Sequence, residues 1–308
     1  MLINREVLLA KIEATYNVDP IPTAALDAML VENLSPANEG LRMTERPGVR
    51  ASIGALQYVY GDTLRSISFD AELKGSGVAG TAPELGVLFR GCAFGETIAA
   101  GVSVTYAPVS TGHESLTLYY YQDGMLTKLT GARGTVSFAF EAGMPAKASF
   151  TFTGHTSTPT DVALVNPTFD TTTPEPFKGA TFTIDSFAAT IGQLSFDMSN
   201  QIAMPSDCSA NDGFGEIRVT GRDVAGSIDP EKELVSVEAF EANMRNGTTM
   251  ALATGVIGAT TGNRYAVNMP AVYYRDLGDG DREGIRTLEC SFGASEATTD
   301  DEVSIAFT

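Results

Sequence analysis

The chain has 308 residues, of which 38 are acidic and 20 are basic, so its net charge is −18. A surface this acidic repels phosphate backbones and argues against a grip on nucleic acid through counterion release. Gly is frequent (31 residues), Trp is absent, and Phe, Tyr, Thr, Val and Ala carry the apolar pattern. This mixture is typical of β-sheets joined by tight turns.

The first elements follow from periodicity and from helix punctuation. Residues 3–16 have Leu and Ile side chains at helical spacing and predict a short helix. The X-Pro pairs within 19–22 then favour an extended arm. Residues 65–73 alternate apolar and polar side chains, which predicts a strand. A proline near the start and a glycine at the end predict a helix over 83–91.

Further strands are predicted wherever apolar and polar residues alternate or β-branched and aromatic residues gather. In chain order they cover 97–106, 115–121, 135–141, 149–153, 182–184, 194–196, 217–219, 249–257, 263–269, 285–292 and 302–307. Asp123-Gly124 predicts a hairpin turn. A second helix is expected over 231–245, and the Thr- and Pro-rich stretch 154–176 is interpreted as an interdomain linker, packed through 162–165.

Two stretches, 67–95 and 215–247, have the pattern of one repeated unit. Each contains an alternating strand, a glycine-containing turn, the triplet Val-Ala-Gly (Val78–Gly80 and Val224–Gly226) and a proline that opens a short helix. A repeat near half the chain length predicts two similar domains and assembly by pseudo-symmetry, rather than one catalytic cleft.

The predicted domains are 1–155 and 156–308, with net charges of −4 and −14. Antiparallel strands with one helix per domain predict a mainly β fold, in which each domain is a β-sandwich or split barrel with a flanking α-helix. Two long excursions, 37–62 and 199–215, precede the corresponding strands of the two units. Long excursions on a compact β-domain are often functional, and these are interpreted as contact surfaces.

Two motifs resemble ligand sites. Gly75–Gly80 matches GxGxxG between a strand and a helix, but the matching turn at 221–226 lacks the middle Gly, and the alternating strands do not suit a buried parallel sheet. The acidic residues of RDLGDGDREG lack the spacing of a calcium loop and are interpreted as a polar hairpin tip between 265–274 and 285–292. The acidic residues are Asp276, Asp279, Asp281 and Glu283.

The sequence offers little for nucleophilic or metal chemistry. His113 and His155 are the only histidines and are expected in polar loops. Cys92, Cys208 and Cys290 have no CxxC spacing, and we interpret them as buried free thiols. There is no nucleophile elbow, HExxH or Walker loop. A pair of carboxylates that meet only in the folded chain could still serve glycoside hydrolysis, and the sequence leaves this alternative open. No catalytic, cofactor-binding or metal-binding residue is therefore predicted, and no cofactor.

Several segments resemble the tail tube proteins of long-tailed bacteriophages, in the two-domain branch of that family. The most specific are GRDVAGSIDPE within 215–233 and DREGIRT and DDEVSIAF within 278–308. Residues 121–154 resemble the end of the first domain, and LLAKIEATYNVDPIPT resembles the opening segment. The resemblance covers most of the chain and is weakest over 37–62.

The resemblance implies a structural virion protein without catalysis. Subunits of such tails form rings, inner strands close a β-barrel around a channel, and stacked rings make a tube through which double-stranded DNA passes without specific binding. The implied partners are further copies of the chain, the tape-measure protein, the tail terminator and distal tail or baseplate proteins. The sequence shows no signal peptide and no 18-residue apolar run, so no membrane partner is expected. We expect the chain to be made in the host bacterial cytoplasm.

Other functions stay open from the residues alone. The chain could serve as a baseplate hub, tail terminator or capsid decoration protein, or as a nucleotide- or carbohydrate-binding enzyme with a convergent polar pocket.

The tube hypothesis leads to three expectations. The excursions should contact the neighbouring ring, and the channel should be negatively charged. Because rings of this kind have six domain positions, a two-domain chain should form a homotrimeric ring.

Overall fold

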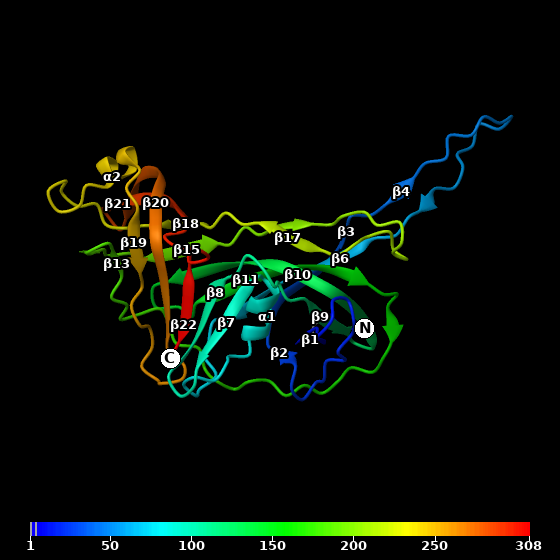
Figure 1. The fold of residues 1–308 in the computed structure, drawn as a ribbon, viewed down its shortest axis with the longest axis horizontal. Coiled ribbons are helices and arrows are strands. Elements are labelled where there is room, and N and C mark those ends of the chain that lie inside the picture. Colours follow the sequence, from blue (N-terminus) through cyan, green and yellow to red (C-terminus); the bar gives the residue numbers. More distant parts are fainter. Residues whose placement is uncertain (1, 4) are drawn as a thin grey trace.

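The computed structural model describes residues 2–3 and 5–308, and its architecture is mainly β, as predicted (Figure 1). Two short helices, α1 (Gly86–Gly91) and α2 (Phe240–Asn246), accompany the strands. Every pairing between described strands is antiparallel, and most strands belong to one connected network.

The first half of the chain forms a run of seven hydrogen-bonded neighbours. Across the sheet they are β2 (Ala28–Met29), β1 (Glu6–Ile12), β9 (Leu116–Gln122), β10 (Met125–Glu141), β11 (Lys147–Thr156), β6 (Leu64–Glu72) and β3 (Glu32–Glu39).

The second half forms a run with the same order of chain connections. Across the sheet its strands are β14 (Phe187–Ala188), β13 (Thr183–Ile184), β19 (Met250–Ala253), β20 (Tyr265–Arg282), β21 (Ile285–Ala294), β18 (Ala225–Ile228) and β15 (Gln193–Asp197). In each run the helix occurs at the same place along the chain, after the strand in sixth position across the sheet and before the strand in third position. Thus α1 follows β6 and precedes β9, and α2 follows β18 and precedes β19.

Two ladders join the halves. The last five residues of β10 pair with β15, in a register that sets Phe138 opposite Phe196. At the other side β22 (Ser304–Phe307) pairs with both β20 and β8 (Ser103–Pro108), and β8 forms a hairpin with β7 (Phe94–Ala99).

The remaining strands are short. β12 (Thr160–Asp161) extends the edge of β10, β4 (Met43–Thr44) pairs with β5 (Val59–Tyr60), and β16 (Gln201–Ala203) pairs with β17 (Arg218–Gly221).

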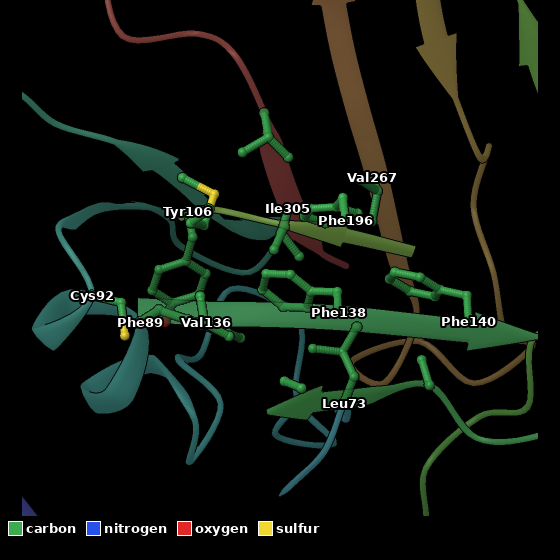
Figure 2. Close-up of a cluster of buried hydrophobic side chains, with 14 of the residues drawn as sticks. Leu73, Phe89, Cys92, Tyr106, Val136, Phe138, Phe140, Phe196, Val267 and Ile305 are labelled. Atoms are coloured by element: carbon green, nitrogen blue, oxygen red, sulfur yellow. The ribbon is translucent and has the colours of Figure 1, made fainter. Parts of the chain in front are cut away.

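The apolar core runs across the predicted boundary at 155/156. The ring centroids of Phe138 and Phe196 lie 4.7 Å apart in a stacked arrangement (Figure 2). Phe89 of α1 packs against Phe307 of β22. All four rings belong to one cluster of buried side chains. The continuous core counts against two separately packed bodies, while the division into domains 1–155 and 156–308 stays a prediction.

The helix predicted over 3–16 is wrong, apart from residue 4, which lies outside the described part. Glu6–Ile12 is the strand β1, which lies between β2 and β9. Four consecutive residues from Val7 to Ala10 are buried, so both faces of the strand are covered. A strand buried on both faces carries a continuous apolar run, which mimics one helical turn.

Three further expectations need correction. The helix expected over 231–245 begins only at Phe240, so Pro230 does not open it. The strand expected over 97–106 is the β7–β8 hairpin. The two Val-Ala-Gly triplets are not equivalent, because Val78 is 61 % exposed in a turn after β6, whereas Val224 is buried at the entrance to β18.

Candidate assembly surfaces

The most prominent surface feature is an arm, residues 41–61, that leaves the body between β3 and β6 (Figure 1). The β4–β5 pairing and two backbone hydrogen bonds, between Arg42 and both Gly61 and Asp62, hold the two strands of its base together. Its apolar side chains are exposed: Val49 and Ile53 are as accessible as in an extended chain. Apolar residues held this far from a core indicate a partner surface.

The second excursion lies against the base of the arm. The Arg42 guanidinium sits 3.7 Å from the centroid of the Phe214 ring and donates to the Gly213 carbonyl (2.6 Å) and to Ser206 Oγ (3.0 Å). Phe214 in turn packs with Leu64 and Ile217 in a small cluster of buried apolar side chains. The two excursions, 37–62 and 199–215, therefore form one continuous surface, which the sequence did not predict.

A polar brace holds the second excursion to the sheet. His155 lies in β11, and its Nδ1 is 2.6 Å from Asp212 Oδ2 while its Nε2 is 3.0 Å from the Tyr16 hydroxyl. The Ile217 N–H donates to that hydroxyl (2.8 Å). His155 is buried, which corrects the prediction of a polar loop.

Burial and hydrogen bonding set the protonation states of the two outer groups of the brace. Burial raises the pKa of Tyr16 to about 12, so its hydroxyl stays a neutral phenol in the physiological range. Burial acts to raise the pKa of Asp212, but the hydrogen bonds from His155 and from the Phe214 N–H, together with the nearby His155 ring, outweigh it and lower that pKa. The group thus carries a neutral phenol and an ionised carboxylate, and its observed role is to fix the segment around Ile217.

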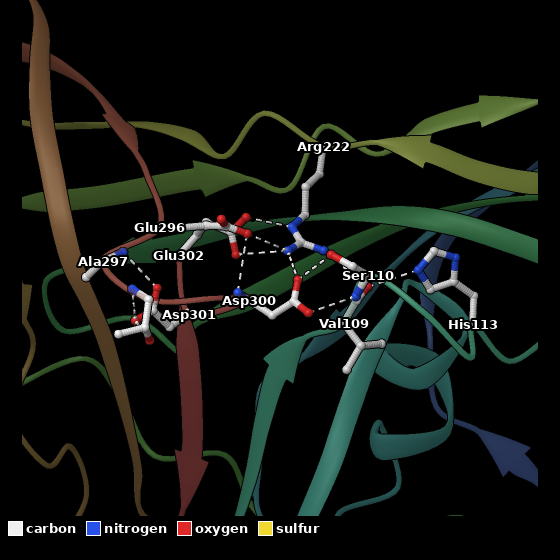
Figure 3. Close-up of polar contacts among 10 residues, drawn as sticks. Val109, Ser110, His113, Arg222, Glu296, Ala297, Asp300, Asp301 and Glu302 are labelled. Atoms are coloured by element: carbon white, nitrogen blue, oxygen red, sulfur yellow. Dashed lines mark hydrogen bonds and ion pairs between the residues drawn. The ribbon is translucent and has the colours of Figure 1, made fainter.

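A partly buried ion cluster joins the two halves at another point. Arg222, just after β17, donates to Glu302 (2.8 Å), to Asp300 and to the carbonyl of Val109 (3.1 Å) (Figure 3). The Ser110 N–H donates to Asp300 (3.1 Å), so the β8–β9 loop of the first half is bound to the second half through shared partners. The side chains of Arg222 and Glu302 are only 13 % and 10 % exposed.

One comparison with known proteins decides the family. The family model described as phage tail tube protein matches residues 3–308, which is nearly the whole chain. The chain belongs to the phage tail tube protein family. It is therefore a structural component of a phage tail, and the family implies self-assembly into a tube. No curated protein sequence matches it.

The glycine-rich motif has a packing role in this tail tube protein. The Gly75 N–H donates to the side chain of Asn263 (2.8 Å) and the Gly77 N–H to the carbonyl of Gly262 (3.0 Å). A Cβ on Gly75 would lie 2.2 Å from the Gly262 carbonyl oxygen. The glycines of the motif thus let a first-half loop approach a second-half loop closely.

The other candidate motifs are also structural. Asp276, Asp279 and Asp281 lie within β20, so only Glu283 is at the predicted hairpin tip. Within the described residues, no group of three or more His, Cys, Asp or Glu side chains could hold a metal ion. Cys92 and Cys290 are buried free thiols as predicted, whereas Cys208 is exposed, which corrects that prediction.

The predicted linker is anchored rather than loose. Leu164 and Val165 pack against a buried cluster of the first half, whereas Val162 is exposed, so the packing expected for 162–165 is found only in its second half. Lys74 donates to the Asp170 carbonyl (2.9 Å) and lies 3.7 Å from Glu84, with 6 % of its side chain exposed. In the described part of the chain, no helix is long and apolar enough to cross a membrane.

Proposed function

We propose that this chain is the major subunit of a phage tail tube, that three copies close each ring, and that stacked rings enclose the channel for DNA. The proposal includes the absence of catalysis and the duplication of one domain. It also includes synthesis in the host cytoplasm and contact with tape-measure, terminator and distal tail proteins at the two ends of the tube.

The observation that carries the proposal is the identical strand order of the two runs, together with the ladder that joins them. In that ladder the outer edge of β15, the last strand of the second run, pairs with the end of β10. The strand of the first run in the place of β15 is β3, and the strand of the second run in the place of β10 is β20.

The same contact can therefore recur between chains. Among described strands, β3 pairs only with β6, so its outer edge is open. An open edge is a template for another strand. If β3 pairs with β20 of a neighbouring chain, contacts of the β10–β15 kind alternate around the ring, one within each chain and one between chains. Head-to-tail contacts of this kind close into rings. Pro36 has no N–H, so the pairing would use the residues on either side of it.

Imaging assembled tubes down their axis tests the proposal. Three chains per ring, seen as six similar domains of two alternating kinds, is the expected result. Six whole chains per ring, or no tube from purified protein, would contradict it.

The channel is proposed to be negatively charged, with the excess charge coming from residues 156–308. Soluble subunits should then give no mobility shift of double-stranded DNA at physiological salt up to about 100 μM, where nonspecific DNA-binding proteins already bind. Salt-sensitive binding below that concentration would refute the electrostatic part alone.

A further inference from the structure

A second unpartnered apolar surface lies at the end of the molecule opposite the arm. A groove of about 590 Å³ opens between α2 and the hairpin of β20 and β21. We call it the α2 groove, and apolar side chains form part of its lining. They are Val235, Phe240, Met244, Leu277 and Leu288. Beside it Leu234 and Val237 are 73 % and 55 % exposed, so the apolar surface continues out of the groove.

The charges of the arm and of the groove are complementary. The arm carries Arg42, Arg46 and Arg50 against one acidic residue, Glu45, although the chain as a whole is strongly acidic. The groove has more acidic than basic side chains. Its Lys232 is bound to Asp279 and its Arg245 to Glu241, which leaves Glu233 and Glu238 without a basic partner among the described residues.

One of these carboxylates is partly desolvated. Burial raises the pKa of Glu238, and among the described residues only the Asn243 amide donates to its side chain (2.8 Å). An arginine brought to the rim would form a charge-assisted hydrogen bond there, the kind that fixes orientation as well as adding affinity.

The positions of the two surfaces exclude a contact within one chain. The arm and α2 lie at opposite ends of the longest axis of the molecule (Figure 1). An arm can therefore reach only the groove of another copy, and each copy offers one of each. Such a contact is heterologous, so it can propagate from copy to copy without leaving an arm unused.

We infer that the α2 groove is the receptor for the arm of a second copy of this chain, with Val49 and Ile53 against its apolar lining and Arg46 and Arg50 facing Glu233 and Glu238. The inference rests on the proposed function, because it requires self-assembly. It adds the receiving surface, which neither the family nor the strand pairing assigns.

Site-directed disulfide formation tests the contact. In a Cys208→Ser background, which removes the exposed native thiol, one preparation carries Ile53→Cys and another carries Val235→Cys. The two are mixed under assembly conditions, oxidised and run on a non-reducing gel. Covalent dimers are expected in the mixture and in neither preparation alone. Ile53→Cys mixed with Val78→Cys, an exposed site on the turn after β6, is the matched control and should give none.

The outcomes separate the inference from the proposed function. Tubes without dimers in the mixture would overturn the docking and leave the tube proposal intact. Dimers in the Ile53→Cys preparation alone would mean that arms bind arms, which also overturns it. Absence of any assembly by the Cys208→Ser parent would remove both proposals together.

Charge reversal gives a second, independent measurement. Arg50→Glu and Glu233→Arg should each lower the assembled fraction about two- to fivefold, as for a rim ion pair, and the double variant should recover most of it. Ile53→Asp should lower assembly at least about tenfold, whereas Val102→Asp, an exposed position in the β7–β8 turn, should not. Additive losses in the double charge variant would contradict the assigned pairing.

Discussion

The seam between the two halves makes a quantitative prediction about Phe138. Its ring is 2 % exposed and stacks on Phe196, its partner across the β10–β15 ladder. Phe138→Ala deletes most of a buried aromatic side chain and should lower the free energy of unfolding by about 3–5 kcal/mol. For 308 residues the entropy of unfolding is about 0.65 kcal/mol/K, so the melting temperature should fall by roughly 6 °C.

The coupling between the two rings tests the physical reason. A stacked pair contributes about 0.5–1.5 kcal/mol beyond its buried area, so the double-mutant cycle of Phe138→Ala and Phe196→Ala should show this much non-additivity. Calorimetry of dilute, unassembled subunits measures it, with Val102→Ala at an exposed turn as the control.

The shared core also predicts the shape of the melting curve. Because the apolar core crosses the boundary at 155/156, the protein should unfold in one cooperative thermal transition. Phe138→Ala should shift this whole transition to lower temperature. Two transitions of which only one moves, or strictly additive losses, would refute the reasoning.

Three other perturbations follow from the same contacts. Gly226→Ala would place a Cβ 2.3 Å from the Ser195 carbonyl oxygen and should cost at least about 1–3 kcal/mol, measured by urea unfolding, whereas Gly54→Ala on the open arm should cost nothing measurable. Burial, which raises the pKa of Asp300, is outweighed by hydrogen bonds from Ser110 and Arg222, which lower it below 3.8. The unfolded chain therefore takes up this proton first, and stability falls as the pH drops through and below that value. Arg222→Met should cost about 3 kcal/mol at pH 7, and the cost should decrease as the pH falls below 3.8, whereas a cost independent of pH would contradict the assignment. Replacing residues 45–58 by a tight turn, which keeps Arg42 and the β4–β5 pairing, should leave the melting temperature within about 2 °C but abolish tube formation in electron micrographs, and normal tubes would refute the role of the arm.

Period-2 alternation located the strands that have one covered face. The strand over 65–73 is predicted from sequence because its apolar and polar residues alternate. In the structure the apolar residues of this alternation are buried and the polar ones are only half-buried. The hairpin at Asp123-Gly124 was equally readable, since Gly124 adopts a positive φ of 107° in that turn. In both cases the local sequence contains the whole cause of the structure.

The sequence failed where the cause lies elsewhere in the chain. Residues 7–10 form a strand because β2 and β9 pair with its two edges. Both partners come from other parts of the chain, so the sequence of residues 7–10 alone does not reveal them. His155 is buried because Tyr16 and Asp212 come to meet it from distant segments.

The candidate surfaces were predicted only in part. The excursions were found by length, because 37–62 and 199–215 interrupt the alternation. Their contact through Arg42 and Phe214 joins residues more than 170 positions apart and left no local signal. The α2 groove depends on how Phe240 and Met244 face Leu277 of a distant strand, which periodicity does not encode.

The pairing of β22 with β8 has a consequence for the timing of folding. Phe307 stacks on Phe89, and its ring centroid lies 6.0 Å from that of Tyr106. Phe89 and Tyr106 therefore complete their packing only when β22, about 200 positions further along the chain, pairs with β8. During synthesis the ribosome must deliver residues 304–307 before α1 has its full cover. Until then the β8 edge is open and competent to bind the wrong strand. The protein should thus reach its final packing only after translation of these residues.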